Sequence, residues 1–271
     1  MADEVRYHML RPEQIVKRRK ECSIAYVPIG TLEWHGVHNP LGADTLQAEG
    51  IAIRCAEKGG LAFPPLYYGE SRVEALMEAN AKDRDKIAAK MELPVTNFDA
   101  PRMPFSAAEQ VLNYHKLLFH ILAELETLGF EVGVIVAGHY PLIDHARSAV
   151  LMFNQRRYDD KVRMLAWAFV DYLLVTDQFD CAGDHAGGWE TSHVMALHPQ
   201  TVDLSLLPPK GEPLIGAGGK MAPQDSTAEF GRKTIDAAVD VAVKEAQHRL
   251  KNKGTYMGHG KSLQEGLWKK K

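Results

Sequence analysis

The stretch SIAYVPIGTLEWHGVHNPLGAD, residues 23–44, joins an apolar run to a polar segment rich in turn residues. The apolar run, residues 23–30, is typical of a strand that is buried in a sheet. The polar segment that follows contains Glu33, His35, His38 and Asp44, which are all side chains that can bind a metal. This stretch therefore predicts a buried strand that ends at a candidate metal site.

Similar apolar runs, several of them ending in Gly, alternate with helical patterns along the chain. Strands are predicted at residues 23–30, 61–69, 131–138 and 161–170, and helices at 45–60, 106–129 and 227–251, with one more helix beginning near Glu190. Strands that alternate with helices favour an α/β fold with a largely parallel sheet. We expect Asp44 to be the N-cap of the first helix, and Ser106 and Glu109 to form a capping box.

Length and composition are those of an ordinary globular chain of 271 residues, with a formal net charge of −3 and 45% hydrophobic residues. We expect one domain over residues 1–271, with an insertion or lid at 70–105 where the sequence is charged and irregular. The balanced charge gives no indication of a nucleic-acid partner. No segment approaches the ~20 apolar residues that span a bilayer, and the three scattered cysteines fit a reducing compartment, so a cytoplasmic protein without a membrane partner is expected.

The candidate metal-binding residues follow the predicted strands. Ligand sites of open α/β sheets lie beyond the carboxyl ends of the strands. Glu33 and His35 are two residues apart, so in an extended segment they project to the same side. Asp44 follows a turn-rich segment that can fold back, and its two oxygens could each bind one cation. His139 follows a predicted strand and a Gly that permits a close approach, which makes it a further candidate ligand.

Other polar residues in these segments have simpler interpretations. His38 is expected to brace the loop by bonding to its backbone, and Glu49 to face solvent or to pair with Arg54. We expect His115, His120 and His248, which lie inside helical patterns, to be surface residues or to have satisfied hydrogen bonds.

Three separated motifs resemble, in order, those of the creatininase (creatinine amidohydrolase) family. They are GTLEWHGVHNPLGAD at residues 30–44, GH at 138–139 and HAGGWETS at 185–192. The family patterns read G-s-x-E-q-H-G-p-H-L-P-l-g-x-D, N-G-H-g-g-N and H-A-G-x-x-E-T-S. The resemblance implies a three-layer α/β/α sandwich with a mostly parallel central sheet, a dinuclear metal hydrolase and a homohexamer.

The resemblance also implies roles for single residues. One cation would be held by Glu33, Asp44 and His139, and a second by His35 with the bridging Asp44. His185 would be the catalytic histidine. Beyond the resemblance, we expect Asp184 or Glu190 to orient it or to complete the metal shell.

The chain departs from the family at several of these positions. A family glutamate that completes the second metal site is Pro141 here, and Glu190 is our candidate to supply the missing ligand. Trp34 stands where the family has Gln or Glu, and we expect it to wall a substrate pocket together with Tyr140 and Trp189. These departures argue against creatinine as the substrate.

The resulting hypothesis is a metal-dependent amidohydrolase that cleaves a non-peptide C–N bond, in a cyclic amide or a formamide, with water activated by two divalent cations. Mixed nitrogen and oxygen ligands suit Zn²⁺, Mn²⁺ or Fe²⁺. His185 would give a proton to the departing amine. No G-x-S-x-G context for a nucleophilic serine is present in the sequence.

Two alternatives remain open at this point. The altered segment His139-Tyr140-Pro141 also fits a non-catalytic sugar- or nucleotide-binding protein on the same fold. A metal-dependent lyase or isomerase acting on a sugar derivative would keep the metal site and change the reaction.

Overall fold

The structure, a computed structural model, describes residues 4–69, 82–98, 105–155 and 164–256. Parts of two predicted features lie outside these residues. They are residues 70–81 and 99–104 of the predicted insertion, and residues 161–163 at the start of the last predicted strand.

The described strands form one parallel sheet. Strand β1 (Ile24–Ile29) pairs with β2 (Leu61–Ala62) and with β3 (Val132–Ala137), and β3 pairs with β4 (Leu165–Val170), in the order β2-β1-β3-β4. The predicted α/β fold with a parallel sheet is therefore confirmed. Strand β2 is much shorter than the predicted 61–69, because Pro64 and Pro65 have no N–H to donate to a neighbouring strand.

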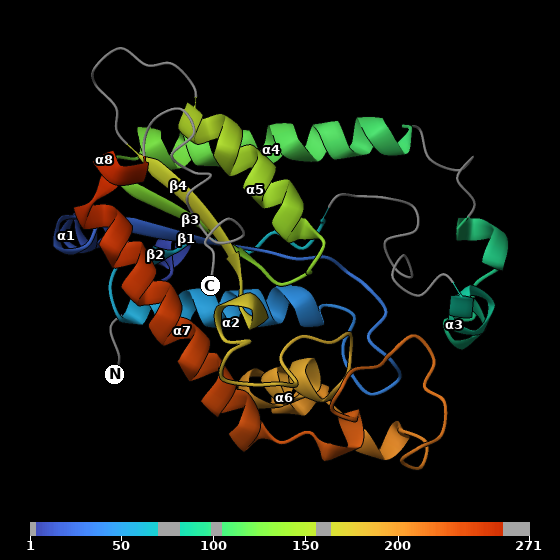
Figure 1. Cartoon of the computed structure of the whole chain (residues 1–271). Helices are drawn as coiled ribbons and strands as arrows, with labels where there is room; N and C mark the ends of the chain where they lie inside the picture. Colours follow the sequence, from blue (N-terminus) through green and yellow to red (C-terminus); the bar gives the residue numbers. More distant parts are fainter. Residues whose placement is uncertain (1–3, 70–81, 99–104, 156–163, 257–271) are drawn as a thin grey trace.

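Helices cover both faces of the sheet and give three layers (Figure 1). One face packs against α2 (Ala43–Glu57) and α7 (Ala228–Lys251), and the other against α4 (Ala107–Thr127) and α5 (Leu142–Gln155). Along β3, Val134 and Val136 belong to the core under α2 and α7, whereas Ile135 and Ala137 belong to the core under α4 and α5. This alternation follows from the two-residue period of a strand that is buried on both faces.

The remaining described elements are short or peripheral. Helices α1, α3, α6 and α8 span Pro12–Glu21, Arg84–Lys90, Gly188–Leu197 and Lys253–Tyr256, and short 3-10 helices lie at Tyr7–Met9, Val95–Phe98, Tyr172–Leu174, Pro199–Thr201, Leu204–Leu206 and Pro223–Asp225. Within the described residues, no helix combines the length and the apolar character that a bilayer crossing requires.

Two helix starts were predicted at the level of single residues. The Oγ atom of Ser106 accepts the N–H of Glu109, and the Glu109 carboxylate accepts the N–H of Ser106, so the capping box of α4 is confirmed. The prediction for Asp44 was wrong, because Gly42 is the N-cap of α2 and Asp44 lies inside its first turn. Helix dipoles favour a carboxylate at such a position, and the Asp44 side chain remains available for other partners.

The described part of the predicted insertion packs onto the loop that follows β1. Ile87 and Ala88 of α3, together with Phe98, form a small apolar cluster with Trp34. The Asp83 carboxylate accepts the N–H of Gly216, which fastens the start of this segment to a second loop. Residues 82–98 therefore cover the side of the Trp34 loop.

Candidate metal centre

The carboxyl ends of β1 and β3 lie side by side and bring the predicted ligands together. Ile29 is paired with Ala137, and the N–H of Gly138 donates to the carbonyl of Ile29 at 2.8 Å. A β-carbon added to Gly138 would lie 1.9 Å from the carbonyl oxygen of Asp44. Because only glycine fits so close to another backbone, Gly138 lets the end of β3 touch the first turn of α2. His139 is thereby delivered next to Asp44.

Glu33, Asp44 and His139 form one group of candidate ligands. The Oε2 atom of Glu33 lies 3.0 Å from Nδ1 of His139, and Oδ2 of Asp44 lies 3.2 Å from the same nitrogen. All three residues are buried, and one ligand atom from each lies within 4.8 Å of the others.

His35, Asp44 and Glu190 form a second group with the same spacing and burial. The Nε2 atom of His35 lies 3.0 Å from Oδ1 of Asp44 and 3.4 Å from Oε2 of Glu190. The other ring nitrogen of His35 is hydrogen-bonded to the carbonyl oxygen of Glu33, which must accept. In a neutral His35 the proton therefore sits on Nδ1, and Nε2 has the lone pair that could bind a cation.

The chemistry of these side chains fits divalent cations. Among the described residues, Oε1 of Glu33 is buried without a hydrogen-bond partner, and Oε2 of Glu33 and Oδ2 of Asp44 both face the same ring nitrogen of His139. Buried charge that lacks compensation costs several kcal/mol or more, and a cation bound by carboxylates and imidazoles removes that cost. Asp44 belongs to both groups and directs a different oxygen to each.

The charges within these two groups shift the pKa values of their histidines and of Asp44. Burial alone would lower the pKa of His139, but the Asp44 and Glu33 carboxylates raise it to about 10. Burial also opposes the charged form of His35, yet Asp44 and Glu190 raise its pKa well above the usual range. Burial would raise the pKa of Asp44, and the two histidines hold it well below that of an exposed aspartate. Protons and cations therefore compete for the same negatively charged site.

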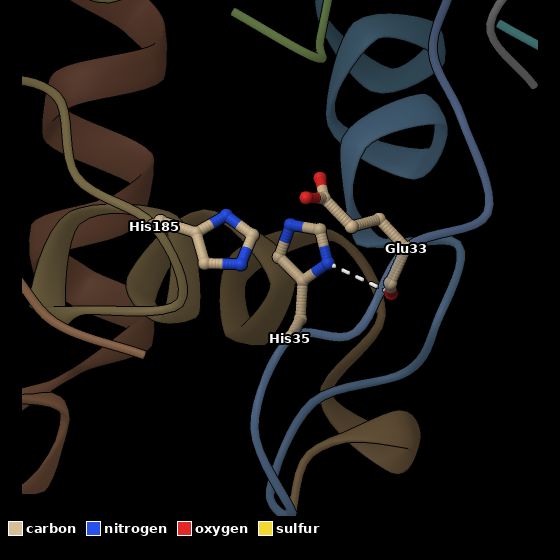
Figure 2. A group of neighbouring side chains, drawn as sticks. All are labelled: Glu33, His35 and His185. Atoms are coloured by element: carbon tan, nitrogen blue, oxygen red, sulfur yellow. Dashed lines mark hydrogen bonds between the residues drawn. The ribbon is translucent and has the colours of Figure 1, made fainter. Parts of the chain in front are cut away.

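His185 lies against this centre. Figure 2 shows the imidazole of His35 between His185 and Glu33. The centroids of the two histidine rings are 4.6 Å apart, and Nε2 of His185 hydrogen-bonds to the carbonyl oxygen of Trp34 at 2.9 Å. Because that carbonyl can only accept, it places the proton of a neutral His185 on Nε2 and leaves Nδ1 as the acceptor.

Asp184 and Trp189 have other partners in the structure. The Asp184 carboxylate accepts the backbone N–H groups of Gly187, Trp189 and Glu190, so it caps the start of α6. Burial and the Glu190 carboxylate raise the pKa of Asp184 to about 7. Trp189 is fully buried in the core between α6 and α7, and its Nε1 donates to Asp171. This placement is that of a packing residue, because a side chain without accessible surface offers none to a substrate.

The other two predicted substrate contacts, Trp34 and Tyr140, differ in solvent exposure. Trp34 is buried under the cluster around α3, and its Nε1 donates to the carbonyl of Ile215. Tyr140 is half-buried, its ring centroid lies 4.5 Å from that of Tyr172, and its hydroxyl accepts the N–H of Asp184 at 3.5 Å. Tyr140 therefore lies beside the capped start of α6.

Several supporting contacts were incompletely predicted from the sequence. His38 was predicted to bond to the backbone of its own loop, but its Nε2 lies 3.0 Å from the hydroxyl of Thr191 on α6. Arg54 pairs with Asp236 of α7. Sequence reasoning missed the polar contacts of Gln47 and His193, because these depend on how α2 and α6 pack against each other.

Comparisons with known proteins agree with this geometry. A family model described as "Creatininase: Creatinine amidohydrolase" matches residues 8–246. A creatinine amidohydrolase from Pseudomonas putida is 28% identical over 195 residues, which is 67% of this chain and 66% of that protein.

Solved structures share the fold at low sequence identity. The crystal structure of a creatinine amidohydrolase (creatininase) has a TM-score of 0.65 and 18% identity, and covers 92% of this chain and 98% of that one. A mutant creatininase of Zn-Zn type has a TM-score of 0.62 and 19% identity, with 92% and 99% covered. A Mn creatininase has a TM-score of 0.62 and 18% identity, with the same coverage.

Proposed function

The chain belongs to the creatininase family, and on this premise we propose that it is a metal-dependent amidohydrolase that cleaves a non-peptide C–N bond of a small molecule. The observation that carries the proposal is the position of Asp44, whose two oxygens reach two different groups of buried ligands. A carboxylate that bridges two cations needs this arrangement.

We assign one cation to Glu33, Asp44 and His139, and the second to His35, Asp44 and Glu190. When bound, such a cation pair supplies a water of lowered pKa and polarises the substrate carbonyl. Zn²⁺ and Mn²⁺ are the first cations to test, since structural neighbours are Zn-Zn and Mn forms, and Fe²⁺ suits the same ligands. Pro141 offers no ligating side chain, and Glu190 takes the place of the ligand it cannot supply.

His185 is the residue that moves a proton in this proposal. Its Nε2 is held by the Trp34 carbonyl, so Nδ1 can take a proton and deliver it to the departing amine. Asp184, which caps α6, is left out of this acid–base role. A cyclic amide or a formamide is the proposed substrate class, with Tyr140 close to the reacting bond. By family resemblance, we propose a homohexamer located in the cytoplasm.

The test combines metal content with activity. Protein purified without chelator is expected to contain about two divalent cations per chain, and a panel of cyclic amides and formamides is expected to release ammonia, formate or an amine. A folded chain that binds no divalent cation even when one is supplied would overturn the proposal. Binding of a sugar or nucleotide that is recovered unchanged, without turnover of any amide, would favour the non-catalytic alternative, and conversion of a sugar derivative without hydrolysis would favour a lyase or isomerase.

A further inference from the structure

A second pair of polar residues joins α2 and α6 one helical turn beyond the metal centre. Asp44 on α2 and Glu190 on α6 meet at His35, and three residues further along each helix Gln47 meets His193. Residues three apart lie on the same face of a helix, so the two contacts follow one another along the interface between α2 and α6.

The contact between Gln47 and His193 is buried and hydrogen-bonded. Nδ1 of His193 lies 3.1 Å from Oε1 of Gln47, and Nε2 of His193 lies 2.8 Å from the hydroxyl of Thr234 on α7. The side chain of His193 has no accessible surface, and Gln47 is 4% exposed. Buried polar contacts of this kind fix the relative position of the elements that they join, because each lost hydrogen bond leaves a buried group unsatisfied.

A third contact between α2 and α6 follows along the same interface and is apolar. A β-carbon added to Gly50 of α2 would lie 2.6 Å from the methyl groups of Leu197 on α6. Leu197 therefore packs directly on the α2 backbone and sets how closely the helices approach there. Between this contact and the metal centre, Gln47 and His193 set the spacing.

We infer that His193 is a positioning residue for the second cation: through Gln47 it sets the spacing of α2 and α6, and so holds Glu190 within reach of Asp44 and His35. The inference rests on the proposed two-cation function. The first cation group does not depend on α6, because Glu33 and His139 lie on the loops after β1 and β3. Loss of the His193–Gln47 contact is therefore expected to weaken one cation and spare the other.

The experiment measures two Zn²⁺ dissociation constants, by titration against a competing chelator, in the full-length protein. In His193→Leu and in Gln47→Leu, the second constant is expected to rise about 10- to 100-fold, as for other residues that orient metal ligands. The first constant stays within about twofold, which also shows that the centre has folded. His193→Asn places an amide N–H at the position of Nδ1, can still bond to Gln47, and is expected to restore the second constant.

Thr234→Val is the matched control. It removes a buried polar partner of the same histidine without touching the Gln47 contact. It is expected to lower the free energy of unfolding and to leave both constants unchanged. If His193→Leu does not fold, Gln47→Leu and His193→Gln, whose amide lies at the position of Nε2 and leaves no polar group at that of Nδ1, give the answer.

The outcomes separate the inference from the proposed function. Two cations in the wild type with an unchanged second constant in both leucine variants would overturn the inference alone. Equal weakening of both cations, or equal weakening by Thr234→Val, would reduce His193 to a general stabilising residue and would also overturn it. A wild type that binds only one cation would overturn the inference together with the two-cation proposal.

Discussion

The carbonyl oxygen of Asp44 lies against the α-carbon of Gly138, so closely that a β-carbon at position 138 would sit 1.9 Å from it. A backbone contact therefore helps to bring two polar groups of the candidate metal centre together. Asp44 contributes its carboxylate to both candidate ligand groups, and the residue after Gly138 is His139.

Gly138→Ala should separate the end of β3 from the first turn of α2. The added methyl group cannot fit, and overpacking of this kind costs ~1–3 kcal/mol or more of unfolding free energy. We expect a lower urea midpoint and a loss of bound cation in metal analysis. Gly254→Ala, where the new methyl group would meet no atom within 4 Å, is the control and should change neither quantity. Normal metal content in Gly138→Ala would show that the close contact is not needed.

Asp44→Asn should lose most of both cations, because one carboxylate serves both ligand groups. The amide has no negative charge and can present only one oxygen, so it cannot bridge two cations. Metal content per chain is the measurement. Asp236→Asn removes a carboxylate whose side chain is 62% exposed on α7, and it should keep the wild-type content. Retention of two tightly bound cations in Asp44→Asn would contradict the bridging role.

Glu33→Gln and Glu190→Gln should affect different cations. Glu33 belongs to the group with His139, whereas Glu190 belongs to the group with His35. Each variant is therefore expected to bind about one cation per chain with wild-type affinity, and the double variant should bind neither tightly. If both single variants lost the same cation, the division into two groups would be wrong.

The contribution of His38 to protein stability should decrease as the pH falls from about 6.5 towards 4. Burial lowers the pKa of His38 from the usual 6.5 of an exposed histidine to about 4. Between these values the unfolded chain binds more protons than the folded chain, so the free energy of unfolding falls with pH. His193, whose pKa is lowered by burial to about 3, contributes in the same direction.

Removal of His38 tests this pH dependence. In metal-free protein, His38→Gln should reduce the slope of unfolding free energy against pH by up to ~1.4 kcal/mol per pH unit near pH 5. Urea unfolding across the range measures this slope. His120→Gln, which changes a histidine side chain that is 72% exposed on α4, should leave the slope unchanged. An identical slope in wild type and His38→Gln would mean that His38 is protonated in the folded protein.

The sequence was most informative where local patterns decide structure. The apolar run before Glu33 predicted β1, and the S-x-x-E pattern predicted the start of α4, because both depend on neighbouring residues. The proximity of Glu33, His35, Asp44 and His139 was also predicted, since the carboxyl ends of parallel strands meet at one edge of a sheet.

The sequence was least informative where packing between distant elements decides a side chain's partner. Asp184 has the residue type of an acid–base partner, yet three N–H groups at the start of α6, one of them from its N-cap, occupy its carboxylate. Trp189 has the type of a pocket wall, yet it is fully buried between α6 and α7. The contact between Gln47 and His193 depends on the registration of two helices, which spacing in one chain does not specify.

The candidate ligands lie far apart in the sequence, and this affects the stability that bound cations could add. His35 and Glu190 belong to the same candidate group but lie far apart in the sequence, so a cation held between them would cross-link a loop of roughly 155 residues. A cross-link of that span restricts the unfolded ensemble, and a ligand bound only by the folded state adds its binding free energy to stability. Resistance of the protein to heat and to proteases would then depend on the supply of metal in its surroundings.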